Sequence, residues 1–83
     1  MSDQVIVTLC FDQTEKDFAL PAKIPLKELY PRLLAVLGNV DETYRQAAGI
    51  CLRRADGFLI DPDATLLDYG VKNGARLTVS MEG

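Results

Sequence analysis

The stretch that decides the fold runs from residue 65 to residue 79: Thr65-Leu66-Leu67-Asp68-Tyr69-Gly70-Val71 and, after five further residues, Leu77-Thr78-Val79. The first part is short and apolar, and it is followed by Asn73-Gly74, a dipeptide typical of tight turns. From residue 76 to residue 81, Leu77, Val79 and Met81 alternate with polar residues. This alternation predicts a final strand whose apolar side, including Met81, faces a core.

The N-terminal part of the chain predicts two strands. Residues 5–12 are rich in β-branched and aromatic side chains, with the apolar residues on one parity. Gln13-Thr14-Glu15 interrupts this run, and residues 16–22 resume the alternation with Phe18 and Leu20 facing one way. We therefore expect the chain to open with a hairpin.

After this hairpin the apolar period changes to that of a helix with one buried stripe. The positions that carry the stripe are Leu26, Leu29, Tyr30, Leu33, Leu34 and Leu37. Gly38 is expected to end this helix in the left-handed conformation. Pro31 removes one backbone hydrogen bond, so either the helix bends there or its regular part starts near Tyr30, with Pro31 in its first turn.

The middle of the chain predicts a helical turn and a second hairpin. Residues 41–48 favour a short helical turn with Asp41 as N-cap and Gly49 as terminator. Residues 50–55 and 58–60 read as strands joined by Asp56-Gly57, a strong hairpin signal. The expected order is β-β-α-β-β-turn-β, an α+β domain spanning residues 1–83 with a core at about residues 4–81.

Composition excludes several classes of function. The 83 residues include no histidine and no tryptophan, and their net charge is −3. The commonest general base is missing, and the negative charge opposes binding to nucleic acid. Cys10 and Cys51 form no metal-binding or redox motif, and no apolar run is long enough to span a membrane. We expect no enzyme activity, no cofactor, no metal and no membrane insertion.

The stretch from Thr65 to Val79 resembles a segment of ubiquitin, Thr-Leu-x-Asp-Tyr-x-Ile followed by the final strand. With the element order, this resemblance implies a ubiquitin-like β-grasp: a mixed sheet packed on one helix, with the first and fifth strands paired in the middle. Two cysteines on strands separated by the fifth strand are not expected to form a disulfide.

Two features of ubiquitin have no counterpart here. Ubiquitin-type modifiers and related sulfur carriers end in Gly-Gly, whereas this chain ends Ser80-Met81-Glu82-Gly83. We expect no covalent conjugation; the alternative is a modifier or sulfur carrier that uses Gly83. With Leu52 and Leu77 facing inward, Arg53 and Ser80 stand where the ubiquitin interaction patch has Ile and Val, and a one-residue shift puts Arg54 there instead.

A closer resemblance is to YukD and EsaB, ubiquitin-like accessory proteins of bacterial type VII (ESX-like) secretion systems. They share the length, the absence of a diglycine tail and the ending Leu-x-Asp-x-Gly-Ile/Val-x-Asn-Gly-x-x-Leu, which residues 66–77 match throughout. Residues 20–38, including Pro31, also resemble the cytosolic ubiquitin-like domain of the membrane subunit EccD. A domain cut from an EccD-like protein is therefore a further alternative.

The resemblance to YukD and EsaB implies a non-catalytic adaptor that docks by a sheet face or a strand edge. Its implied partners are membrane-anchored subunits of the secretion machinery and the secretion ATPase, and its implied location is the cytoplasm, with recruitment to the inner face of the membrane. The candidate interaction residues are Ile6, Thr8, Arg53, Arg54, Arg76, Thr78 and Ser80. The alternative for the arginines is ordinary solubilising charge.

Overall fold

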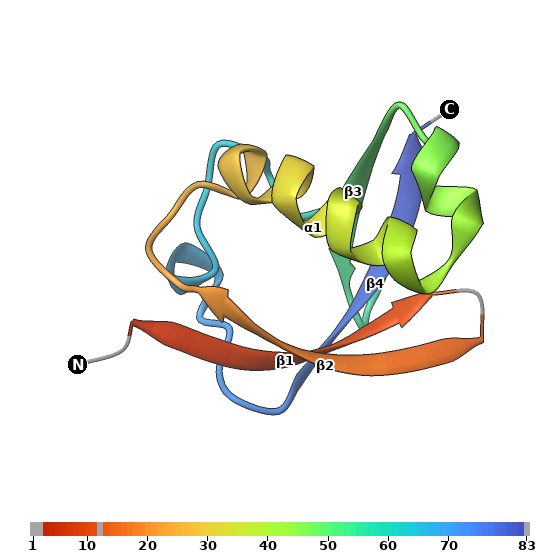
Figure 1. Ribbon diagram of the computed structural model, residues 1–83. Coiled ribbons are helices and arrows are strands. Elements are labelled where there is room, and N and C mark those ends of the chain that lie inside the picture. The colour runs from red at the N-terminus through yellow and green to blue at the C-terminus, as the bar shows by residue number, and fades with distance from the viewer. Residues whose placement is uncertain (1–2, 12, 83) are drawn as a thin grey trace.

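In the residues that the structure describes, four strands form one mixed sheet, and a single α-helix packs on one side of it (Figure 1). The computed structural model describes residues 3–11 and 13–82. The strands are β1 (Gln4–Phe11), β2 (Thr14–Pro21), β3 (Gly49–Arg54) and β4 (Ala75–Glu82), and the helix is α1 (Leu26–Val40). Two 3-10 helices, Glu42–Gln46 and Leu67–Tyr69, lie in the connections.

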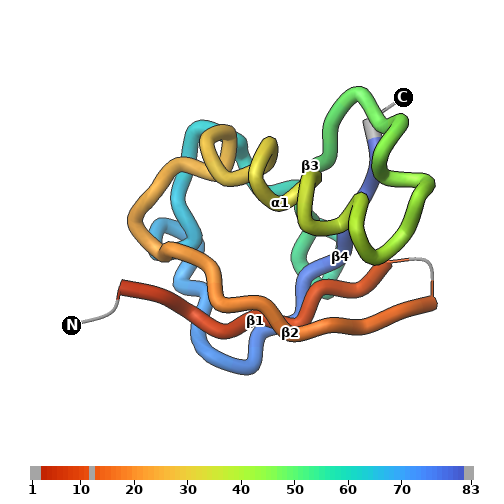
Figure 2. Tube along the Cα trace, in the orientation of Figure 1, coloured from red at the N-terminus to blue at the C-terminus, as the bar shows by residue number. Residues whose placement is uncertain are grey.

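The strand order is β2-β1-β4-β3. β1 pairs with β2 antiparallel and with β4 parallel, while β3 pairs with β4 antiparallel. The first and last strands therefore lie side by side in the middle of the sheet (Figure 2), which confirms the β-grasp expected from the sequence.

The predicted strand at residues 58–60 is wrong. The turn at Asp56-Gly57 forms, with Gly57 at φ 87°, but only an isolated bridge between Arg53 and Leu59 follows it. The chain then turns away because Ile60 is fully buried and the next amide, that of Asp61, donates to the Tyr69 hydroxyl at 3.0 Å. A tertiary contact thus ends the pairing that the hairpin signal predicts.

The helix α1 begins at Leu26 and continues to Val40, so Pro31 is an internal residue and not part of the first turn. The prediction that Gly38 ends the helix is also wrong. Gly38 is helical and buried, and a Cβ there would lie 3.1 Å from Cγ of Arg45. Arg45 Nε donates to the Gly38 carbonyl at 2.9 Å, so the glycine allows the following 3-10 helix to approach α1 closely.

That 3-10 helix, Glu42–Gln46, has the N-cap predicted for it. The side chain of Asp41 accepts a hydrogen bond from the Thr43 amide at 3.0 Å. Gly49 is not its terminator, because the helix ends at Gln46 and Gly49 already begins β3.

The core lies between α1 and the covered face of the sheet. Val7, Leu9 and Leu77 from the two central strands are almost completely buried, as the alternation predicts. Met81 differs from the prediction: it lies near the end of β4 and is 42% exposed. The full set of buried apolar residues is Val5, Val7, Leu9, Phe11, Leu20, Leu26, Leu29, Leu33, Leu37, Tyr44, Ile50, Leu52, Ile60, Leu66, Leu77 and Val79.

The segment from residue 65 to residue 71 is held by its own side chains. The Thr65 amide donates to Asp68 Oδ2 at 3.0 Å, and the Asp68 amide donates to Thr65 Oγ1 at 3.1 Å. This reciprocal pair is a capping box, and it holds Leu66 in the core. The motif that resembles ubiquitin is therefore a structural device that precedes β4.

The Asn73-Gly74 turn fixes β4 beside β1. Asn73 Oδ1 accepts from the Ile6 amide, and the Gly74 amide donates to the Ile6 carbonyl, both at 2.8 Å. Gly74 has φ 89°, a conformation that favours glycine. Both backbone groups of Ile6 are thereby bound immediately before the parallel pairing of Val7 with Ala75 begins.

Replacing Asn73 by alanine should destabilise the fold by about 1 kcal/mol, because the Ile6 amide loses its acceptor at the start of the central strand pair. Urea unfolding followed by circular dichroism measures this loss. Lys72→Ala, an exposed neighbour in the same turn, is the matched control and should leave the midpoint almost unchanged. Equal midpoints for the two variants would contradict the proposed role of the Asn73 side chain.

Candidate functional site

The face of the sheet that points away from α1 carries the predicted interaction residues. Because Val7, Leu9, Leu77 and Val79 point into the core, the intervening residues of β1 and β4 point outward. The register also pairs Arg53 of β3 with Thr78 of β4, so Arg53 joins this outer face. The predicted residues on the outer face are Ile6, Thr8, Arg53, Arg76, Thr78 and Ser80.

Arg54 is the predicted site residue that does not lie on the outer face. It pairs with the inward-facing Leu77 at the end of β3. Its Nη2 donates to Asp56 Oδ2 at 2.6 Å, and its guanidinium lies 5.1 Å from the centre of the Phe58 ring. Once Leu52 is placed inward, strand alternation alone separates Arg53 from Arg54.

Two acidic residues of the outer face were missed by sequence reasoning. Thr8 Oγ1 donates to Asp17 Oδ1 at 2.6 Å, and Glu15 forms an ion pair with Arg76. Both acids come from β2, whose register places Asp17 opposite Thr8 and Glu15 opposite Cys10. The signal was present in the hairpin: once its register is fixed, these side chains must share the face of Thr8.

The outer face is polarised across its width. Arg76 is neutralised by Glu15, toward β2. Arg53, on β3, donates from Nη1 to the Gly57 carbonyl at 3.2 Å. The structure therefore turns Arg53 and Arg76 in opposite directions. Asp17 then leaves a negative charge on the β2 side of the face, and Arg53 leaves a positive charge on the β3 side.

The two cysteines also belong to the outer face, and both are free thiols. Cys10 is on β1 and Cys51 on β3, with β4 between them. Cys10 Sγ lies 3.7 Å from both Glu15 Oε1 and Arg76 Nη2, so the thiol is part of the polar contacts between β2 and β4.

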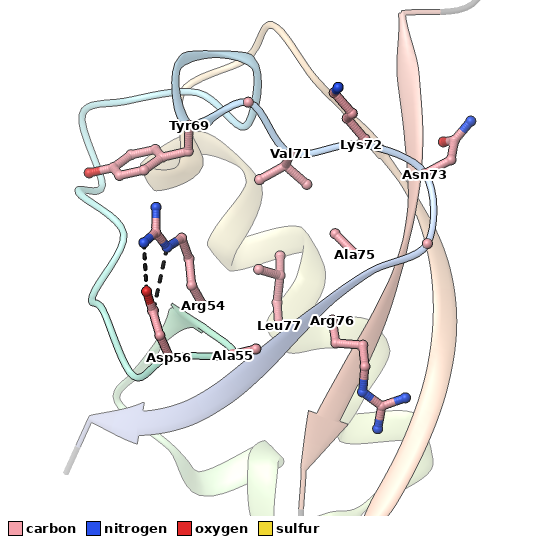
Figure 3. Close-up of a pocket in the computed structure, with 12 residues that line it drawn as sticks. Arg54, Ala55, Asp56, Tyr69, Val71, Lys72, Asn73, Ala75, Arg76 and Leu77 are labelled. Carbon is pink, nitrogen blue, oxygen red and sulfur yellow. Dashed lines mark hydrogen bonds and ion pairs between the residues drawn. The ribbon is translucent and has the colours of Figure 1, made fainter.

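A groove of about 570 Å³ lies beside the start of β4, on the side of Arg54 (Figure 3). Val71 and Leu77 form apolar parts of its lining, and Tyr69 and the Arg54–Asp56 pair lie at one end. The hydrogen bond from Arg54 lowers the pKa of the Asp56 carboxyl, helped by the hydrogen bond from the Phe58 amide. The hydrogen bond to Asp56, together with the negative charge of Asp56, raises the pKa of the Arg54 guanidinium.

The titratable side chains of the groove and the outer face include arginine, aspartate, glutamate and cysteine. Histidine does not occur in the sequence. Within residues 3–11 and 13–82, no group of three cysteine, aspartate or glutamate side chains is arranged to hold a metal ion. In that same part of the chain, no helix is both long and apolar enough to cross a membrane. What the arrangement offers is an exposed surface for non-covalent contacts.

The fold and this exposed sheet face define a ubiquitin-like β-grasp domain. More narrowly, the chain belongs to the YukD family, because residues 4–79 match the family described as WXG100 protein secretion system (Wss), protein YukD. None of the curated proteins matches the sequence.

Solved structures of type VII secretion proteins have the same fold. The ubiquitin-like domain of ECCD1 from Mycobacterium tuberculosis is 26% identical, with a TM-score of 0.79 over 92% of this chain and 96% of that domain. The EccD5 ubiquitin-like domain from Mycobacterium xenopi is 21% identical, with a TM-score of 0.82 over 95% and 94%. A chain of the ESX-3 core complex is 26% identical, with a TM-score of 0.68 over 93% of this chain and 16% of that one.

Replacing Arg54 by glutamine should raise the pKa of Asp56 toward its ordinary value, because the Arg54 hydrogen bond is the main cause of the low pKa. In the native protein the pair stabilises the fold above the ordinary aspartate pKa, and this contribution is lost as the pH falls through the lowered value. NMR titration of the Asp56 carboxyl carbon measures the change. Arg32→Gln, on the exposed side of α1, is the control; an Asp56 pKa that is the same in both variants would refute the assignment.

Proposed function

We propose that this protein is a non-catalytic adaptor of a type VII secretion system, which acts by docking the outer face of its sheet on cytosolic parts of the machinery. The observation that carries the proposal is the match of residues 4–79 to the YukD family. The 26% identity to the ECCD1 ubiquitin-like domain supports it, as does a sheet whose second face is left uncovered.

Two residues give the proposed docking face its character. Ile6 lies near the start of the central strand β1, is 51% exposed and offers an apolar contact. Arg53 contacts a carbonyl oxygen, and no described carboxylate forms an ion pair with it. Exposed apolar side chains and arginine are both common in protein interfaces. Thr8, Arg76, Thr78 and Ser80 complete the face.

The proposed partners are membrane-anchored subunits of the secretion machinery and the secretion ATPase. A chain of the ESX-3 core complex contains a domain of this fold within a much longer sequence, which supports such an association. The adaptor would act in the cytoplasm and be recruited to the inner face of the membrane by these partners. It would act without conjugation; Gly83, on which the modifier alternative depends, lies outside the described residues.

Reversing the charge of Arg53 tests the docking face. Arg53→Glu should weaken binding to the partner by about tenfold, since a charge of the wrong sign at an interface costs more than 1 kcal/mol. The measurement is the amount of a WXG100 substrate secreted by cells that carry the variant as their only copy. Thermal unfolding of the purified variant shows whether the fold is intact.

Arg32→Glu makes the same change of charge on the exposed side of α1 and serves as the control. Secretion should fall for Arg53→Glu and stay normal for Arg32→Glu. Normal secretion by a folded Arg53→Glu protein would remove this residue from the site.

A further inference from the structure

The two edges of the sheet differ in how their backbone groups are bound. At the β3 edge, the Leu52 amide donates to the Tyr30 hydroxyl at 3.3 Å, and the Leu52 carbonyl accepts from the Ile60 amide at 3.0 Å. The Arg54 amide donates to the Phe58 carbonyl at 2.9 Å. The helix and the segment after the Asp56-Gly57 turn therefore occupy much of this edge.

The β2 edge has no such cover. The Ala22 amide donates to the Asp3 carbonyl at 2.7 Å and continues the β1–β2 ladder, which shows which residues of β2 face β1. By alternation, the amides and carbonyls of Glu15, Asp17 and Ala19 point away from β1. These three residues are exposed, and none of their backbone groups has a hydrogen bond outside the strand ladder within the described part of the chain.

The charges on this edge restrict what can pair with it. The side chains of Glu15 and Asp17 lie on the outer face at the β2 edge. Glu15 forms an ion pair with Arg76, whereas Asp17 accepts its hydrogen bond from the neutral Thr8 hydroxyl and keeps its charge uncompensated among the described residues. A strand added beside β2 places alternate side chains directly opposite Glu15 and Asp17. Lysine or arginine opposite Asp17 would be attracted, and an acidic residue there would be repelled.

A second copy of this chain is a poor match for the same edge. Two-fold antiparallel pairing centred on β2 brings the acidic side chains of both copies together on one face. The net charge of −3 on each copy adds to this repulsion. Charged residues on an edge strand are a common protection against such self-pairing. The charge pattern thus favours a different, basic partner.

We propose that the β2 edge binds an extended segment of a partner protein as an added strand, with lysine or arginine opposite Asp17. Backbone hydrogen bonds to Glu15, Asp17 and Ala19 provide the binding, and the Asp17 carboxylate selects the sequence, because Glu15 is already paired with Arg76. This inference rests on the proposed function and adds a second contact of defined chemistry. The contact lies at the β2 edge of the sheet, whereas Arg53 lies on β3 at the other edge.

The test uses a synthetic peptide with blocked ends, Thr-Lys-Val-Lys-Val-Lys-Thr, and a second peptide with glutamate in place of each lysine. The lysine peptide should shift the NMR signals of the β2 amides and slow the hydrogen exchange of Asp17 and Ala19 in the native protein. The glutamate peptide should bind at least about tenfold more weakly, because one of its acids faces Asp17. No binding of the lysine peptide, or equal binding of both peptides, would overturn the proposal.

Variants at one position separate the edge from the rest of the fold. Ala19→Pro removes an outward amide and should abolish peptide binding, whereas Ala19→Ser keeps the amide and should bind normally. If Ala19→Pro does not fold, the double variant Glu15→Lys, Asp17→Lys replaces it and should reverse the preference between the two peptides. If the folded double variant still prefers the lysine peptide, the β2 edge is not the binding site. The same conclusion follows if a folded Ala19→Pro protein binds the lysine peptide normally.

The outcomes also separate this inference from the docking face. Arg53→Glu should bind the lysine peptide as the native protein does, because Arg53 lies on β3. Loss of secretion in Arg53→Glu together with no peptide binding to the native protein would leave the docking face standing and remove the added strand. Sedimentation that shows a dimer disrupted by Ala19→Pro but not by Ala19→Ser would assign the edge to a second copy and overturn the proposal.

Discussion

The binding of both Ile6 backbone groups by the Asn73-Gly74 turn is the constraint on which the rest of the structure depends. Parallel strands cannot be joined by a tight turn, and β2, α1 and β3 lie between β1 and β4 in the sequence. The turn determines where β4 starts beside β1. A slip of one residue would exchange the buried and exposed sides of β4, placing Thr78 in the core and Leu77 in water.

This register also determines which residues lie on each face of the sheet. The covered face is filled by α1 and by apolar side chains, and no buried polar or charged residue occurs in the described core. The uncovered face holds the polar residues, which bind one another across β2, β1 and β4. A domain of this size has one core, so its exposed face, edges and rim are the parts left for binding.

Much of the fold could be predicted because its signals are local. Alternation, the helical period, the Asp41 cap and the two turns at Gly57 and Gly74 each depend on a few neighbouring residues. The features that could not be predicted depend on distant contacts. The Tyr69 hydroxyl binds the chain just after Leu59, and Arg45, seven residues after Gly38, packs against this glycine and binds its carbonyl.

The candidate site shows the same division. Strand parity places Ile6, Thr8 and Thr78 on one face, and the element order already brings these strands together. Arg54 is a candidate only if the third strand is shifted by one residue, and the observed register, with Arg53 opposite Thr78, excludes that shift, because adjacent residues of a strand face opposite ways. The contributions of Glu15 and Asp17 required the hairpin register, which is set by the turn around Gln13, at φ 64°.

The internal pairing of charges limits what can drive binding to the outer face. Arg76 is bound by the Glu15 carboxylate of this chain, so a partner gains little by offering an acid to Arg76 or a base to Glu15. Exposed ion pairs of this kind contribute little to stability and are weakened by salt. Their larger effect is to hold the side chains in place, which lowers the entropy lost on docking. In the proposed docking, recognition would then depend on the shape around Ile6, on the charge of Arg53 and on the backbone groups at the β2 edge, features that the net charge of the chain does not reveal.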